Sequence, residues 1–159
     1  MLIDQVTLEN GVVYGVDTDV TSIPEIKLIS AVNSKLNDLI DIAAGNARAA
    51  FVSLGSYIDQ EYLLAKTEAQ AWLDGGNDPN ATPSSVEDHI AMFDVGAEQA
   101  AQEIVETAAQ WEQALTLIRR ARLGGKAAVR AAETIEAKEQ AAQEAIAMLK
   151  DIRPQEGAL

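Results

Sequence analysis

The sequence predicts a mainly α-helical, elongated and oligomeric protein that begins with a β-hairpin. The helices are predicted by the 28 alanines, which favour helix, and by apolar residues that recur at steps of three and four after residue 22. The hairpin is predicted by alternating apolar residues on both sides of Asn10-Gly11. Because large apolar side chains are few in this chain of 159 residues, we expect a thin core that neighbouring subunits complete.

Residues 1–20 are expected to form a β-hairpin anchor. The Asn10-Gly11 pair lies between two alternating runs, and Asn-Gly readily forms a two-residue type I′ turn. No later segment resembles a third strand, and a lone two-stranded ribbon is only marginally stable in water. The hairpin must therefore pack on a helix or extend a sheet in another chain.

A long amphipathic helix is expected over residues 22–74. Apolar residues recur eleven apart, as at Leu28 and Leu39, and this spacing of about 3.67 residues per turn suits a nearly straight helix. Gly45 lies within the run, so a break there is the alternative to one unbroken helix. An unbroken helix would be roughly 75 Å long at 1.5 Å per residue. Copies of the protein or a partner would then have to cover much of its apolar stripe.

Residues 75–96 are expected to form a loop and a short helix. Turn-forming residues follow Asp74 and end the long helix. A second helix is expected to begin at Thr82-Pro83, where Ser84 and Glu87 have the spacing of a capping box.

Residues 97–153 are expected to form an antiparallel, alanine-rich helical hairpin. Gly124-Gly125 is predicted to be the turn between its two helices. The tip from Arg122 to Arg130 has few large apolar residues, so firm packing is expected at the end that carries Trp111 and Leu149.

Composition argues against several classes of function. The chain has no cysteine, which excludes disulfides and thiolate metal sites, and its one histidine excludes a cage of several histidines. A net charge of −13 argues against nucleic acid and anionic membrane surfaces as partners. The apolar runs are too short to span a bilayer, and the first twenty residues are acidic, unlike a signal peptide. We therefore expect a soluble protein made in a cytoplasm.

Three weaker candidates for chemistry remain. His89 follows two acidic residues and could act in acid–base chemistry, but no second residue completes a catalytic set. The loop from Asp74 to Thr82 offers oxygen donors for calcium, yet it lacks the glycine and glutamate of an EF-hand, which favours simple turn residues. Five basic residues between Arg119 and Arg130 could bind an anion or a partner, or could offset a helix dipole. We therefore expect no enzymatic activity, cofactor or metal.

Twelve apolar residues are the candidates for interfaces with copies of the chain or with other proteins. They lie in the predicted hairpin, along the predicted long helix and at the two tryptophans: Leu2, Val6, Val12, Tyr14, Leu28, Val32, Leu36, Leu39, Leu54, Ile58, Trp72 and Trp111.

A series of short motifs runs from about residue 60 to residue 153. It comprises Lys66–Leu73, a spacer rich in Asp and Asn, Thr82-Pro83, a helix with Ile104 and Trp111, and Arg122 before a glycine turn and an alanine-rich helix. This series resembles a small helical domain of bacteriophage tail and tail-fibre proteins. The resemblance implies a non-enzymatic virion protein of a tail fibre or baseplate, made in the host cytoplasm, forming homo-oligomers such as trimers and binding other phage tail proteins. The alternative is a tail-fibre assembly chaperone or adaptor that is absent from the virion.

Overall fold

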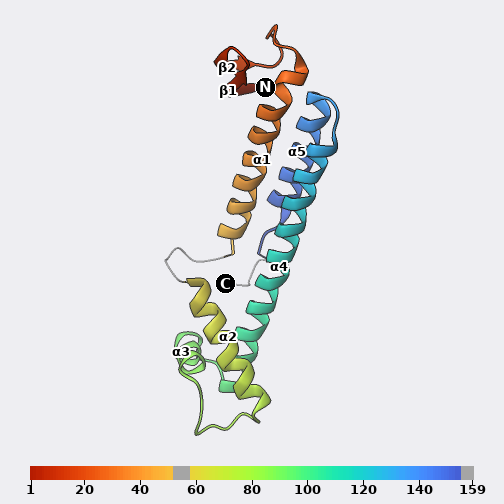
Figure 1. Cartoon of the computed structure of the whole chain (residues 1–159). Helices are drawn as coiled ribbons and strands as arrows, with labels where there is room; N and C mark the ends of the chain where they lie inside the picture. Colours follow the sequence, from red (N-terminus) through yellow and green to blue (C-terminus); the bar gives the residue numbers. More distant parts are fainter. Residues whose placement is uncertain (52–57, 155–159) are drawn as a thin grey trace. The chain divides into compact units, whose positions relative to one another are not determined.

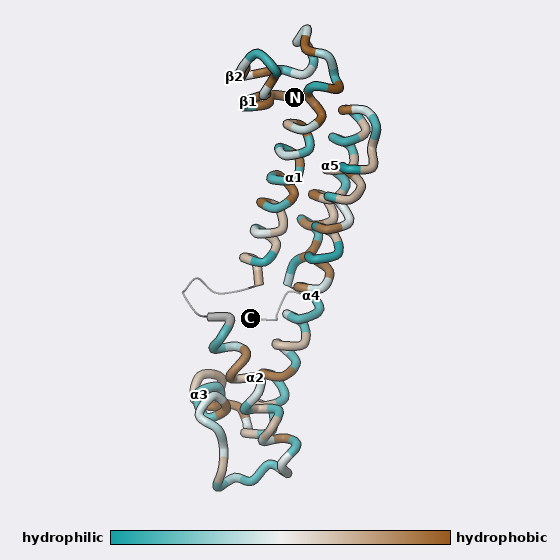
Figure 2. Tube along the Cα trace, in the orientation of Figure 1, coloured by the Kyte–Doolittle hydropathy of each residue, from teal (hydrophilic) through white to brown (hydrophobic). Residues whose placement is uncertain are grey.

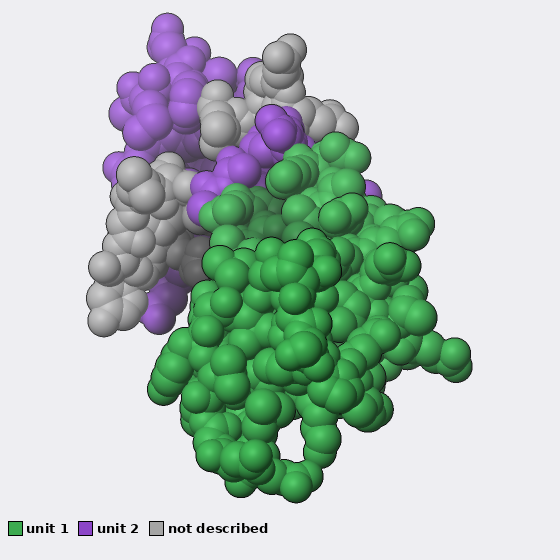
Figure 3. Space-filling view, turned by 90° about the horizontal axis from the view of Figure 1, so that it is seen from above, with its two compact units in different colours: residues 1–47, 117–152 green, residues 48–116, 153–159 purple. Residues whose placement is uncertain are grey.

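The computed structural model describes residues 1–51 and 58–154 (Figure 1). The elements in these ranges are two strands and five helices: β1 (Leu2–Leu8), β2 (Gly11–Asp17), α1 (Glu25–Ala49), α2 (Ile58–Asp74), α3 (Ser84–Phe93), α4 (Ala97–Ala131) and α5 (Ile135–Asp151). The prediction of a mainly helical chain with an N-terminal antiparallel hairpin is therefore confirmed. The chain divides into two compact units: unit 1 holds residues 1–47 and 117–152, and unit 2 holds residues 48–116 and 153–159 (Figure 3).

The β-hairpin has a different turn from the predicted one. Leu8 pairs with Gly11, so Glu9 and Asn10 form the two-residue turn, and the prediction of Asn10-Gly11 as the turn is wrong. Gly11 instead opens β2 with a φ of +141°, a conformation that glycine adopts easily. The register is set by burial, because it places Ile3 opposite Val16 and both side chains enter the core of unit 1.

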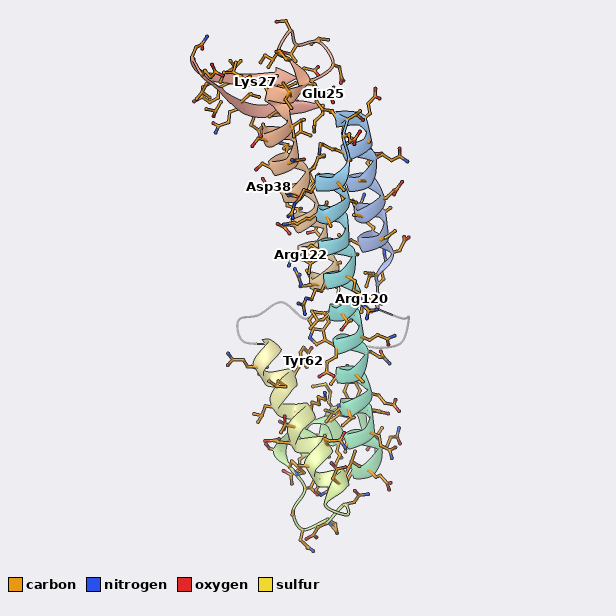
Figure 4. All side chains as sticks on the ribbon, turned by 45° about the vertical axis from the view of Figure 1, so that its right-hand side comes forward. Glu25, Lys27, Asp38, Tyr62, Arg120 and Arg122 are labelled. Carbon is orange, nitrogen blue, oxygen red and sulfur yellow. The ribbon has the colours of Figure 1, made fainter. Side chains whose placement is uncertain are left out.

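The core of unit 1 joins the hairpin to three helical segments. In Figures 1 and 4, α1 lies beside α5 and the later part of α4. Apolar residues recur along α1 (Figure 2), and its buried residues follow one another mostly at steps of four. The core consists of Ile3, Val6, Val16, Leu28, Val32, Leu36, Ile40, Ala44, Ala47, Ile118, Val129, Ala142, Ala145 and Leu149. The α1 stripe is therefore covered within its own chain.

The predicted single helix over residues 22–74 is wrong. α1 ends at Ala49 and α2 begins at Ile58. The alternative of a break at Gly45 is also wrong, because Gly45 lies inside α1. A Cβ atom there would meet nothing within 4 Å. The helix continues through Gly45 because its backbone hydrogen bonds need no side chain, and glycine costs it only about 1 kcal/mol.

The predicted turn at Gly124-Gly125 is also wrong, because α4 continues through both glycines to Ala131. The chain turns instead before Thr134, whose side chain accepts a hydrogen bond of 3.2 Å from the backbone N–H of Ala137 and caps α5. A Cβ atom on Gly125 would lie 2.3 Å from the Cβ of Ala145 in α5. Gly125 therefore permits close contact between two helices. The glycine turn in the motif series from residue 60 to 153 is not formed.

The expected packing of the helical hairpin is wrong as well. Val129, in the supposedly loose tip, is fully buried in unit 1. Leu149 shares this core, whereas Trp111 belongs to unit 2. The two residues therefore do not form one packed end, because α4 supplies residues to both units.

Unit 2 has a small core made by α2, α3 and the first part of α4. Its buried residues are Ala69, Trp72, Val86, Ala100 and Ala101. The indole Nε1 of Trp72 donates a hydrogen bond of 2.9 Å to the carbonyl oxygen of Asp78, which holds the α2–α3 loop against α2. The expected capping box of α3 is absent, because the helix begins at Ser84 and its N-cap is Pro83, which makes no side-chain cap bond.

Candidate interaction surfaces

The structure places His89 in a contact between α3 and α4. Its Nε2 lies 2.8 Å from Oε2 of Glu103, and its ring centre lies 4.5 Å from that of Phe93. Hydrogen bonds from His89 and then from Gln99 lower the pKa of Glu103. No group of three or more His, Cys, Asp or Glu side chains that could hold a metal ion occurs within residues 1–51 and 58–154. These contacts assign His89 a role in joining two helices.

In the candidate calcium loop, Asp74 and Asp78 each use a carboxylate oxygen in local hydrogen bonds, whereas Oδ1 of Asn77 is buried without a partner among the described residues. Oδ1 of Asp78 accepts hydrogen bonds from the backbone N–H of Asn80 at 2.9 Å and from its side-chain amide at 3.1 Å. The side chain of Asp74 accepts a bond of 2.9 Å from Gln70. Asn77 has a φ of 60°, which asparagine tolerates in turns. The geometry thus fits the turn-forming interpretation of this loop.

The basic residues of α4 fall into two groups. Nη1 of Arg122 and Nζ of Lys126 lie 3.1 Å and 2.5 Å from the two carboxylate oxygens of Asp41 in α1. The hydrogen bond from Lys126, and to a smaller extent the one from Arg122, lowers the pKa of Asp41. These two cations therefore hold α4 against α1 within unit 1.

The other three basic residues, Arg119, Arg120 and Arg130, are exposed and form no ion pair with the described residues. Because α4 ends at Ala131, only Arg130 lies in its last turn. The helix dipole therefore does not account for Arg119 and Arg120.

Among the interface candidates in the hairpin, three are exposed. Tyr14 is 72% exposed, Leu2 60% and Val12 45%. Val6, by contrast, is buried in the core of unit 1, so its assignment to an interface is wrong. The three exposed residues are called the outer hairpin residues below.

The interface candidates in α1 are mostly core residues. Leu28, Val32 and Leu36 are buried in the core that α1 shares with the hairpin, α4 and α5, so their assignment to an intermolecular interface is wrong. Only Leu39 is exposed, at 39%. Sequence reasoning missed the more exposed Ile42, because it followed a single stripe of the helix.

The remaining interface candidates belong to unit 2 or lie outside the described residues. Trp72 is buried in the core of unit 2, which corrects its assignment to an interface. Trp111 is half-buried, with its ring centre 5.7 Å from that of Phe51. Leu54 lies outside the described residues, and so does the side chain of Ile58.

A groove of about 290 Å³ lies between β1 and α1. One wall consists of the consecutive residues 3–7 of β1, and the other consists of Lys27, Ser30, Ala31, Ser34, Lys35 and Asp38 of α1. An ion pair of 2.8 Å between Lys35 and Asp4 joins the two walls. A second ion pair, of 2.9 Å, links Lys27 of the helical wall to Glu9, which follows β1. Neither the alternating pattern of β1 nor the helical pattern of α1 predicts this groove, because it forms only where the two elements pack together.

Comparison of the chain with protein-family models, with curated proteins and with solved structures gives no match. Within the part of the chain that the structure describes, no helix is both long and apolar enough to cross a membrane.

Proposed function

We propose that this protein is a non-enzymatic structural component of a bacteriophage tail, in the fibre or baseplate, and that it acts by binding other tail proteins and copies of itself. The binding role is supported by one observation, the exposure to solvent of the three apolar outer hairpin residues Leu2, Val12 and Tyr14. The tail assignment is supported by the resemblance of residues 60–153 to a phage tail domain. This resemblance rests on the motifs of the series other than the glycine turn.

The outer hairpin residues are well placed for docking. Ile3, on the other side of β1, is buried in unit 1, so the hairpin is fixed to a packed core. A partner that covers the outer residues would meet a surface that loses little conformational entropy on binding. Fully burying a side chain of this size is worth about 1.5–3 kcal/mol, and exposed apolar patches commonly mark sites of protein association.

A second candidate function is an assembly chaperone or adaptor that leaves before the particle is complete. It is favoured by the charge of residues 48–116, which hold twelve acidic side chains but only two basic ones, Arg48 and Lys66. Leu63 and Met92, also in this segment, are 62% and 74% exposed. An acidic surface with exposed apolar side chains would mask a basic or apolar surface on a client protein.

Mass spectrometry of purified particles separates the two candidates. Particles from cultures that express the gene should contain the protein if it is a tail component. An assembly chaperone should be missing from particles but should copurify with a tail protein from the lysate. Absence from both fractions would contradict both functions.

Sedimentation velocity tests the role of the outer hairpin residues in self-association. Replacing Val12 and Tyr14 by serine should shift the protein to smaller species. Met148→Ser is the matched control, because Met148 is 60% exposed but lies on α5. A wild-type protein that is monomeric at micromolar concentration would argue strongly against the self-association part of the proposal.

A further inference from the structure

The groove between β1 and α1 lies beside a strand with one unpaired edge. The groove touches all five consecutive residues from 3 to 7 of β1 and the facing side chains of α1, so it runs along the length of the strand on the side towards α1. The sheet within the described residues has only two strands, and β2 pairs with one edge of β1. The backbone groups along the other edge of β1 thus have no strand partner.

We propose that this groove binds an extended, basic segment of a partner protein, which pairs with β1 as a third strand. An unpaired strand edge is a template for an added strand, whose backbone hydrogen bonds supply affinity while side-chain contacts supply specificity. This site does not depend on whether the protein is a tail component. It is also distinct from the outer hairpin residues, none of which lines the groove.

Part of the helical wall of the groove is formed by small side chains. Ser30, Ala31 and Ser34 lie on one face of α1 at steps of one and three, and all three side chains are small. Small side chains on a helix allow another backbone to approach closely. The groove volume of about 290 Å³ is near the lower limit of ligand pockets, which measure about 300–1,000 Å³.

The charges of the groove favour a basic occupant. Lys35 is paired with Asp4, and Lys27 is paired with Glu9. Asp38 is exposed and has no hydrogen bond or ion pair with the described residues, so the uncompensated charge is negative. Figure 4 shows Lys27 and Asp38 at different levels of α1, with Lys27 next to the hairpin. A lysine or arginine of the bound segment would meet Asp38, and the net charge of −13 would attract such a segment.

The polar lining distinguishes this groove from a site for a small apolar ligand. Small-molecule pockets are lined mainly by hydrophobic and aromatic side chains. Here no aromatic residue contributes, and most lining side chains are charged, hydroxyl or amide groups, including Gln5 and Thr7. Backbone amides and carbonyls of an extended peptide suit such a lining better than an apolar ligand does.

The test selects a displayed library of random short peptides on the full-length protein and on the Ser34→Trp variant. Ser34 is exposed and lines the groove, so tryptophan there should fill the groove without disturbing the core. Ser84→Trp is the matched control, because Ser84 is also an exposed helical serine but lies in unit 2. Circular dichroism checks that each variant remains folded.

Peptides enriched on the wild-type protein are expected to carry lysine or arginine and to shift the amide NMR signals of residues 3–7. Ser34→Trp should weaken their binding at least about tenfold, which corresponds to about 1.4 kcal/mol, whereas Ser84→Trp should leave it unchanged. Asp38→Lys should weaken binding by about two- to fivefold, the range for an exposed ion pair. Glu106→Lys, an equal charge change at an exposed helical site in unit 2, should have a smaller effect.

Several results would overturn the proposal. They are no enrichment over Ser34→Trp, enrichment of acidic peptides, or amide shifts confined to residues outside the groove. Sedimentation velocity can give one further result that would overturn the proposal. Loss of self-association in Ser34→Trp alone would show that a second copy of the chain occupies the groove.

Discussion

Two adjacent glycines in α4 should respond in opposite ways to the same substitution. Gly124 and Gly125 both lie inside the helix, so alanine at either site gains about 0.5–1 kcal/mol of helix stability. A Cβ atom on Gly124 meets nothing within 4 Å, whereas one on Gly125 would lie 2.3 Å from the Cβ of Ala145 and 3.4 Å from Cδ1 of Ile40. The first distance is shorter than carbon atoms tolerate, so α5 would have to move.

The expected magnitudes follow from these distances. Gly124→Ala should stabilise the protein by about 0.5–1 kcal/mol, which raises the melting temperature of a chain of this size by about 1–4 °C. Gly125→Ala adds an overpacking cost of about 1–3 kcal/mol, so its net effect should range from near zero to a loss of about 2.5 kcal/mol. Gly124→Ala should therefore be the more stable variant by about 1–3 kcal/mol.

Urea unfolding followed by circular dichroism measures these differences, and hydrogen exchange of the amides in α5 assigns them to unit 1. The rescue is the double variant Gly125→Ala with Ala145→Gly, which removes the colliding atom. A double-mutant cycle should then give a favourable coupling energy of about 0.5–3 kcal/mol. If Gly125→Ala were as stable as Gly124→Ala, the close contact between α4 and α5 would be refuted.

Three further predictions concern the same unit. Leu36→Ala and Leu149→Ala should each destabilise the protein by about 2–5 kcal/mol, because both residues lie in one core; thermal unfolding measures the loss. Lys138→Met should cost about 1–3 kcal/mol in urea unfolding, because the buried ammonium donates a 2.8 Å hydrogen bond to the carbonyl of Val129 near the end of α4. Asp41→Asn should destabilise the protein near neutral pH but not in acid. Hydrogen bonds from Lys126 and Arg122 lower the pKa of Asp41 in the folded state. The ion pair therefore stabilises the fold fully above the ordinary pKa of about 3.9, and this contribution is lost as the pH falls through the lowered pKa of the folded state.

Each of these predictions has a control or a contradicting result. Leu39→Ala is the control for the core pair, because Leu39 is 39% exposed and its loss should cost much less. A large effect at Leu36 alone would show that Leu149 belongs to a separate core. For Lys138, a methionine variant as stable as the wild type would contradict the stabilising role of the hydrogen bond to Val129. For Asp41, melting curves recorded from neutral to acid pH should converge, and a constant difference would exclude the ion pair as the cause.

Local physics accounts for what could be predicted from the sequence. The alternation around Asn10-Gly11 predicted two strands, and both form, because the period of a strand is visible in a few consecutive residues. Helical periodicity likewise predicted the helices α1, α3 and α5, because one face of each is apolar. The acidic composition and the single histidine also limited the classes of function before any contact was known.

Tertiary contacts decided where the helices end and what covers them. Gly124-Gly125 looks like a turn in the sequence, and only the distance from Gly125 to Ala145 shows that it is a packing contact. The periodicity of α1 predicts that Leu28 and Leu36 are buried, but not whether the same chain or another one buries them. In the structure the same chain buries them, in a core that combines the hairpin with residues of α4 and α5 from more than eighty positions later in the sequence.

The same distinction between local sequence pattern and tertiary contact applies to the groove and to the core of unit 1. The sequence by itself determined the type of most elements and their apolar faces, because backbone hydrogen bonding and side-chain period act over a few residues. Only the tertiary structure decided that α1 packs inside its own unit and that β1 borders a groove, because both result from contacts between segments far apart in the chain.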